Sequence, residues 1–228
     1  MATGANVLNG VVGFPTARQM LAAAGYSFNS TNPTPGTAIA YALKAAYSAT
    51  ANGLFSISNP VGSGVNVQLD RLKLIQTATA AANNLVSRYE IYAESGVVAL
   101  TSAALAVTPV NLNPASGAAK ATVTFFSAGA GTVAAAVGTR RLIGLGSCTT
   151  GPAIIHDSLT VEFGADGSAV GTANLTAAKA VAASDFVTHG PAVTVPPGWS
   201  AWMNFWILTQ ITNTPSYEFS LVHNEVPI

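Results

Sequence analysis

The chain has 228 residues, of which 8% are charged, and its nine basic and nine acidic side chains give a formal net charge of zero. Ordinary soluble proteins carry about 25% charged residues. So sparse and balanced a charge argues against a protein whose main task is to bind nucleic acid, because that affinity rests on clustered Lys and Arg. Low charge also gives little electrostatic protection against association. We therefore expect other protein to cover much of the surface.

Cysteine content and hydropathy exclude further classes. The single cysteine, Cys148, rules out an internal disulfide and a cysteine-built zinc site, and we interpret it as a buried or incidental thiol. The first residues show no secretory signal pattern. Residues 121–139 are uncharged and long enough for a membrane helix, but their Gly, Ser and Thr content and initial Thr/Val/Phe alternation favour a strand and a loop. We expect no membrane partner.

The N-terminal residues differ from the rest of the chain. Pro15 lies near the start of a short helix pattern, good helix formers run from Arg18 to Ala24, and Gly25 can end the helix. Turn-forming residues then crowd positions 29–36. We interpret residues 1–36 as an N-terminal arm, ordered mainly by what it contacts, and residues 37–228 as the main domain.

The main domain repeats a pattern of strand, turn and strand. Residues 38–50 suit a helix or a strand, and their period of two favours a strand. In residues 65–77 the apolar face switches near Asp70, which indicates a bulge or a change of pairing partner. Further strands are expected within residues 53–60, 87–95, 121–129, 140–146, 158–172, 191–198 and 217–226, with a hairpin turn at Asp166-Gly167. Short strands between such turns predict an all-β sandwich or barrel.

Residues 199–207 hold all three tryptophans of the chain. Alternation places Trp199, Met203 and Phe205 on one face of a strand, and Trp202 and Trp206 on the other. One face can fill the core, whereas the second needs a further cover from the arm, a neighbouring subunit or a ligand. Aromatic residues are enriched at protein interfaces, which favours subunit or arm packing over sugar stacking.

Catalytic and metal-binding patterns are missing from the sequence. Residues 156–158 bring a His, an Asp and a Ser together, but adjacent residues of a strand point to opposite faces. We interpret His223 as a core histidine on the apolar face of the last strand. The only basic pair, Arg140-Arg141, is interpreted as a solvated or inter-subunit contact. The sequence shows no metal or phosphate motif, so we predict a protein that is not an enzyme, with no catalytic residue, metal or cofactor.

Five stretches within residues 33–228 carry a family resemblance: residues 33–40 (PTPGTAIA), 58–64 (SNPVGSG), 67–74 (VQLDRLKL), 193–207 (VTVPPGWSAWMNFWI) and 215–226 (PSYEFSLVHNEV). A Thr-Pro-Gly-Thr leader is paired with a late Pro-Pro-Gly turn and an aromatic strand. In this the chain resembles the tailed-bacteriophage capsid decoration or cement proteins. Residues 1–32 lie outside the resemblance.

The resemblance implies a jelly-roll-like β-sandwich with an N-terminal arm and a non-enzymatic role. Such a virion protein is made in the host cytoplasm and binds the capsid surface as trimers between capsomers, with the major capsid protein as its partner. The interface is then predicted to include Trp202, Trp206, Arg140 and Arg141. The alternatives are a glycan-binding jelly-roll module of a phage tail or fibre, and a jelly-roll capsid shell protein. Arg18, the only Arg in residues 1–43, is weak support for the shell alternative.

Overall fold

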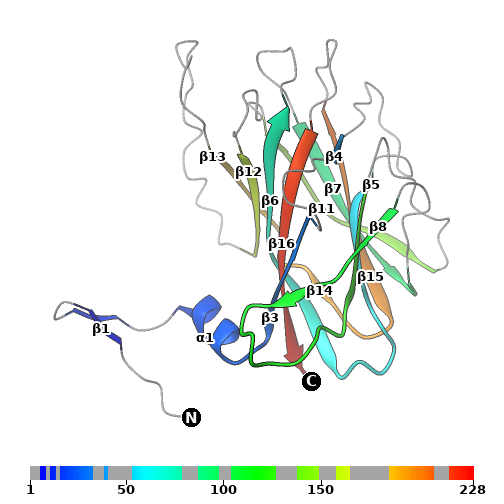
Figure 1. Ribbon diagram of the computed structural model, residues 1–228. Coiled ribbons are helices and arrows are strands. Elements are labelled where there is room, and N and C mark those ends of the chain that lie inside the picture. Colours follow the sequence, from blue (N-terminus) through cyan, green and yellow to red (C-terminus); the bar gives the residue numbers. More distant parts are fainter. Residues whose placement is uncertain are drawn as a thin grey trace, which may run out of the picture.

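Two β-sheets pack face to face around one apolar core (Figure 1). The computed structural model describes residues 6–8, 11–13, 16–32, 39–40, 53–78, 87–97, 104–126, 138–148, 158–164, 185–207 and 216–228. The predicted all-β sandwich is confirmed. Most of residues 38–50, the turn at Asp166-Gly167 and residues 156–157 lie outside the described residues.

The two sheets are built from strands distant in sequence. The first sheet has the order β11 (Arg140–Cys148), β7 (Ser87–Ser95), β15 (Trp199–Ile207), β5 (Gly53–Asn59), β10 (Thr122–Phe126) and β8 (Ala104–Val107). The second sheet has the order β13 (Asp185–Gly190), β12 (Ser158–Phe163), β6 (Val65–Ala78), β16 (Ser216–Pro227), β3 (Ser27–Thr31) and β9 (Val110–Asn111), with β14 (Thr194–Val195) on β6 and β4 (Ile39–Ala40) on β16.

The core forms from the inward residues that the alternating patterns predict. Ala201, Met203 and Phe205 of β15 lie in it, which confirms the inward face assigned to the tryptophan strand. Phe125 of the first sheet stacks on Phe219 of the second. Burial of each such large apolar side chain stabilises the fold by about 1.5–3 kcal/mol, so these contacts hold the two sheets together.

Strand β6 carries the irregularity predicted near Asp70. Val222 of β16 lies opposite Arg71 of β6. The next residue of β16, His223, lies opposite Leu69, so Asp70 is an extra residue in β6. Odd-numbered residues of β6 enter the core before this bulge and even-numbered ones after it. The partner also changes, because β14 pairs with the first half of β6 and β12 with the second.

Helix α1 (Ala17–Ala23) is fixed to the second sheet. Thr16 and Gln19 form a capping box in which each side chain accepts the other's backbone N–H. Gly25 follows the helix with a φ of 78°, as the sequence predicts. Arg18 Nε donates to Asp70 at 2.8 Å, so the β6 bulge also holds the helix. A second contact joins Arg18 to Glu162 of β12 at 3.4 Å.

The predicted boundary of the arm at residue 36 differs from the structure. Strand β3 lies inside that segment, yet it pairs with β16 from Ser27↔Asn224 to Thr31↔Ser220. Phe28 is buried and stacks on the His223 ring. The sequence signal was misleading because turn-forming residues begin at Asn29, within the strand. Cross-strand bonds to β16 outweigh that local preference.

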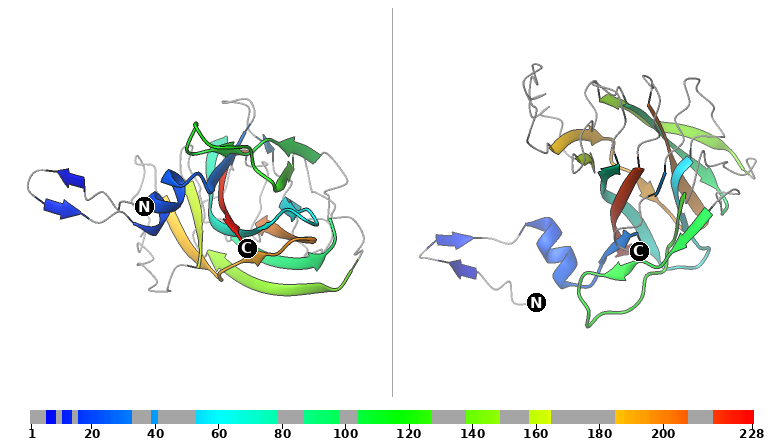
Figure 2. Two further views of the ribbon diagram at one scale, coloured as in Figure 1. Left: turned by 90° about the horizontal axis from the view of Figure 1, so that it is seen from below. Right: turned by 45° about the horizontal axis from the view of Figure 1, so that its top comes forward.

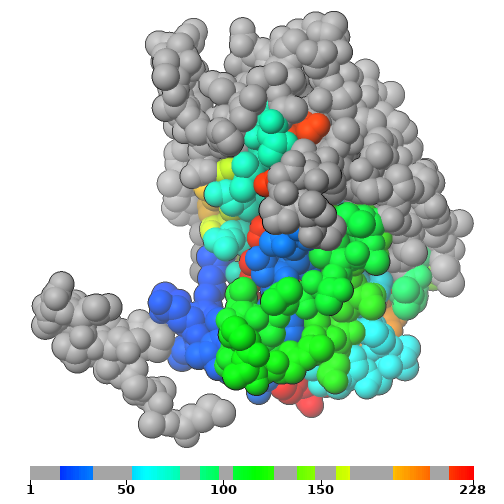
Figure 3. Space-filling view, in the orientation of Figure 1, coloured from blue at the N-terminus to red at the C-terminus, as the bar shows by residue number. Residues whose placement is uncertain are grey.

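The segment that joins β8 to β10 closes over the α1–β3 junction. Leu112 N–H donates to Ser27 O at 2.9 Å, and Asn113 Nδ2 donates to Ala23 O at 3.0 Å. Asn111 Nδ2 likewise donates to Gly25 O at 2.9 Å. In Figure 3 this segment, in green, lies against the blue atoms of the N-terminal part. The α1–β3 junction is therefore held both by Arg18 and by the segment between β8 and β10.

Strands β1 (Asn6–Leu8) and β2 (Val11–Gly13) form a two-stranded antiparallel sheet, here called the N-terminal hairpin. It stands clear of the sandwich on the side of α1 (Figures 1 and 2). Its pairing runs from Asn6↔Gly13 to Leu8↔Val11. In the described part of the chain, no helix has the length and apolarity needed to cross a membrane.

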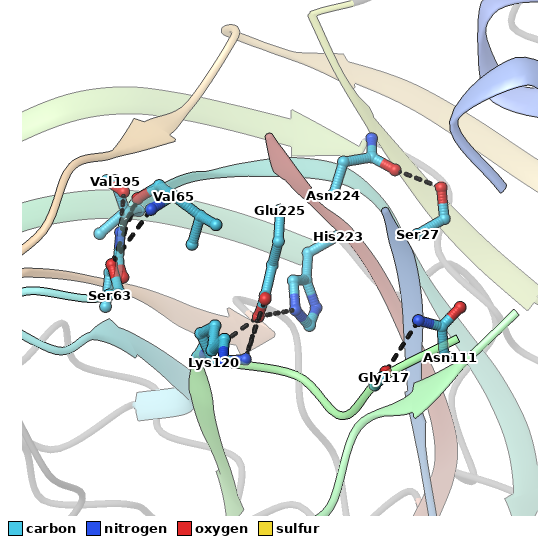
Figure 4. Close-up of polar contacts among 12 residues, drawn as sticks. Ser27, Ser63, Val65, Asn111, Gly117, Lys120, Val195, His223, Asn224 and Glu225 are labelled. Atoms are coloured by element: carbon cyan, nitrogen blue, oxygen red, sulfur yellow. Dashed lines mark hydrogen bonds and ion pairs between the residues drawn. The ribbon is translucent and has the colours of Figure 1, made fainter. Parts of the chain in front are cut away.

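A buried carboxylate ties the end of β16 to the start of β10 (Figure 4). Glu225 is 4% exposed and accepts the backbone N–H groups of Lys120 and Ala121, with shortest distances of 2.8 Å to each. His223 Nε2 lies 3.6 Å from Glu225 Oε1. Burial alone would raise the pKa of Glu225, but the His223 imidazole and the two backbone N–H groups outweigh it and lower this pKa.

We expect Glu225→Gln to lower the free energy of unfolding by about 1–3 kcal/mol at neutral pH, because an amide cannot accept from all three donors. With a lowered folded-state pKa, the carboxylate stabilises the fold fully above its ordinary pKa of 4.5, and this contribution is lost as the pH falls through the folded-state pKa. Urea denaturation of both proteins at neutral pH and at about pH 3 should therefore show a smaller difference in acid.

Glu218→Gln is the matched control, because Glu218 lies on the same strand and is only partly buried. It should cost less than Glu225→Gln. Equal losses in the two variants, or a Glu225→Gln deficit that stays constant with pH, would contradict the assignment.

Candidate interface at strand β11

Strand β11 forms an edge of the first sheet and exposes apolar side chains. Among the described residues it pairs with β7 alone. Leu142, Ile143 and Leu145, here called the β11 edge, are 49%, 36% and 58% exposed. Val187 of the neighbouring strand β13 is 46% exposed. Exposed apolar residues grouped on a sheet edge mark a site where another chain can bind.

A buried ion pair on the outer face of the first sheet holds the start of β11. Glu94 of β7 has no exposed side-chain surface, and Arg140 Nε lies 3.2 Å from its Oε2. The other carboxylate oxygen accepts the Gly138 N–H at 3.3 Å. The Arg140 guanidinium also lies 4.5 Å from the centroid of the Trp202 ring. Arg140 is thus held by a charge partner and by a cation–π contact.

Trp202 completes this cluster from β15. Its ring stacks on Tyr92 with centroids 5.1 Å apart and an interplanar angle of 13°. Tyr92 in turn donates its hydroxyl hydrogen bond to Glu90 Oε2 at 2.7 Å. Tyr92 and Trp202 face each other because they are direct cross-strand neighbours of β7 and β15.

Glycines on the core-facing side of β11 allow it to pack closely against Tyr89 and Pro191. A Cβ at Gly144 would meet the ring of Pro191. One at Gly146 would meet the ring of Tyr89, whose hydroxyl donates to His189 O at 3.0 Å. The ladder between β11 and β7 shifts register between Leu142 and Gly144. The strand is therefore seated on its inner side while its apolar residues face outward.

The structure corrects the interface role predicted for Trp202, whereas that of Arg140, with its side chain 20% exposed, stays a prediction. Trp202 has no exposed surface within the single chain, so the cover that the sequence required is already present. Arg140 is committed to Glu94 and Trp202 of its own chain. Period-two alternation identified the outer face correctly, but it carries no information about what lies over that face.

The other two predicted residues are placed differently. Arg141 is exposed, with its guanidinium 5.7 Å from the centroid of the Trp199 ring. Its interface role remains a prediction. Trp206 lies in β15 opposite Arg88 of β7, and its side chain lies outside the described residues. The arrangement therefore brings Arg140 and Trp202 together and leaves Arg141 at the surface beside the β11 edge.

Sequence reasoning missed the β11 edge itself. The signal lay in "RRLIGLG", where Leu142, Ile143 and Leu145 follow one another without polar alternation. That pattern shows that both faces of the strand are apolar, but not that the strand ends a sheet. Glu94 was also missed, because a single Glu in an alternating strand looks like an ordinary solvated residue.

The outer face of the first sheet is unusual in being both polar and buried. Ser56, Ser58, Ser200 and Asn204 are each at most 3% exposed. Ser58 and Ser200 share a hydrogen bond of 2.7 Å. Among the described residues, no group of three or more His, Cys, Asp or Glu side chains is placed to hold a metal ion.

No family model, no curated protein and no solved structure matched the chain. The resemblance to phage decoration proteins therefore remains a prediction from the sequence.

We expect Arg140→Ala to lower the free energy of unfolding by about 3 kcal/mol, because it leaves the Glu94 carboxylate buried without its charge partner. Arg141→Ala is the matched control on the next residue. Its exposed cation–π contact is worth about 0.5–1 kcal/mol. Chemical denaturation of both variants measures the difference. Similar losses would show that Arg140 is no more structural than Arg141.

Gly146→Ala should destabilise the sandwich by about 1–3 kcal/mol, because the added methyl group displaces either β11 or the Tyr89 ring. Gly117→Ala is the control, since a Cβ there meets nothing within 4 Å. Melting curves of the two variants test the close seating of β11. An unchanged melting temperature for Gly146→Ala would show that the strand has room to move.

Proposed function

We propose that the chain is a structural virion protein that decorates and stabilises a phage capsid, binding as an oligomer, most simply a trimer, between capsomers. The observation that carries the proposal is the β11 edge on a chain with so few charges. An exposed apolar edge strand is a hazard for a free monomer. In a protein that assembles with its own copies and with a capsid, the same edge provides a binding surface.

The second support is the construction of the sandwich. Arg140 and Arg141 both lie over tryptophan rings at the start of β11, and Arg140 is anchored by Glu94. The strand therefore presents Leu142, Ile143 and Leu145 from a fixed backbone. A fixed apolar patch loses little conformational entropy on binding, which suits permanent assembly. The proposed role is non-enzymatic and uses no metal or cofactor, and its partner is the major capsid protein.

The glycan-binding alternative receives no such support. It required a platform made of the Trp202 and Trp206 rings. The Trp202 ring is buried between Tyr92 and Arg140 and offers no face to a sugar. This alternative and the shell protein remain as outcomes of the test.

The test is made on particles of the phage whose genome encodes the chain, purified by density gradient. We expect the chain in a fixed, high ratio to the major capsid protein by quantitative mass spectrometry. Mild denaturant should release it and leave closed shells, because a decoration protein binds the outside of a finished capsid. The released shells should break at a lower temperature, and added pure chain should restore them.

Other results would overturn the proposal. Absence of the chain from particles would exclude a virion role. A few copies restricted to the tail would favour the glycan-binding module. Shells that dissolve when the chain is removed would identify a shell protein. Light scattering of the pure chain should give three times the chain mass of 23.0 kDa, and a monomer at every concentration would remove the trimer from the proposal.

A further inference from the structure

The N-terminal hairpin has the composition of a segment that is meant to be covered. Val7, Leu8, Val11 and Val12 make up most of its two strands, and no charged residue precedes Arg18 in the sequence. An isolated two-stranded hairpin is at best marginally stable in water. The N-terminal hairpin nevertheless stands clear of its own sandwich (Figure 2). A contact with another surface would supply the stability that two strands alone lack.

The root of the hairpin is fixed, which limits where it can go. Phe14 and Pro15 separate β2 from the helix cap at Thr16 in the sequence. The helix is held to the sandwich by Arg18, which binds Asp70 and Glu162. The hairpin is therefore a short arm projecting from a defined point rather than a free tail.

The β11 edge offers a sheet to which the two strands of the hairpin could add. A strand at the edge of a sheet presents backbone N–H and C=O groups for pairing with another strand. In the described part of the chain β11 pairs on one side only, with β7. Leu142 and Leu145 supply apolar contact beside that backbone. The hairpin carries no charged side chain, and the only charged residues of β11 are Arg140 and Arg141. The two surfaces can therefore approach without repulsion between like charges.

We propose that the N-terminal hairpin of one copy adds to the β11 edge of a second copy and extends its first sheet. Main-chain hydrogen bonds give the contact its affinity, and the valine and leucine residues of the hairpin cover Leu142 and Leu145. The hairpin and the edge are different surfaces, so the contact is heterologous, and successive contacts form a ring where the rotation between copies closes. The inference concerns association between copies and holds whether or not they sit on a capsid.

The test is cross-linking between two tagged populations of the full chain, both carrying Cys148→Ser because Cys148 lies on β11. One population carries Val12→Cys and the other Leu145→Cys. We expect a short bis-maleimide to join the two tags after mixing. Val61→Cys is the matched control for Leu145→Cys, because Val61 is 88% exposed and lies in the turn after β5. Cross-linking to Val61→Cys as strong as to Leu145→Cys would overturn the proposal.

A second measurement does not depend on introduced cysteines. Leu145→Glu and Val12→Pro should each weaken self-association about tenfold or more by sedimentation, as expected for the loss of an interface anchor. Because both act on one contact, the double variant should weaken it by less than the product of the two effects. Val61→Glu should leave association unchanged. Multiplicative effects of Leu145→Glu and Val12→Pro would place them at separate contacts and overturn the inference.

The outcomes separate this inference from the proposed function. A chain that forms stable oligomers without the hairpin cross-link refutes the arm contact and leaves the virion role standing. A cross-link found only within single chains that carry both cysteines, at monomer mass, shows that the hairpin binds its own β11 and refutes the exchange between copies. A hairpin cross-link in a protein absent from particles supports the inference and refutes the virion role.

Discussion

The position of β11 depends on one buried charge. Glu94 has no exposed surface, and a buried carboxylate without a partner costs several kcal/mol. Arg140 supplies that partner as the first residue of β11, so the strand begins where the ion pair requires. The Trp202 ring beneath the guanidinium adds a second constraint. Leu142 and Leu145 lie opposite Tyr92 and Glu90, on the same outer face as Arg140, so the contacts that fix Arg140 also fix the face on which these leucines are exposed. The exposure of these leucines therefore follows from the ion pair by which Arg140 neutralises the buried Glu94 carboxylate.

Buried carboxylates make the surface even less charged than the composition suggests. Glu90, Glu94 and Glu225 are all buried, which removes three of the nine acidic side chains from the surface. Each has a structural partner: the Tyr92 hydroxyl, Arg140, or backbone N–H groups before β10. Carboxylates in this protein thus position strands. With these carboxylates buried, few charged side chains remain on the surface to keep copies of the chain apart by electrostatic repulsion.

Local patterns predicted what depends on neighbours in sequence. The switch of apolar face at Asp70 indicated the bulge, because side-chain alternation follows directly from strand geometry. The same rule assigned the two faces of β15. It did not predict that Trp202 is buried, since burial of an outer face is decided by distant parts of the chain. Glu225 and the strand beginning at Ser27 were out of reach for the same reason: their partners are 104 and 197 residues away.

The N-terminal hairpin and the β11 edge are both unfavourable in an isolated chain, and each could stabilise the other. The N-terminal hairpin has backbone pairing but only two strands, which are too few to be stable alone. Among the described residues, β11 pairs with β7 alone, and its leucines are exposed. A stable monomer would protect such an edge with charges or a bulge that turns it away, yet the bulge of β11 leaves Ile143 exposed. Arg141 and the bulge protect only the first half of β11, and Leu142 and Leu145 stay exposed, as expected of an edge that is free only until a neighbour's strand arrives.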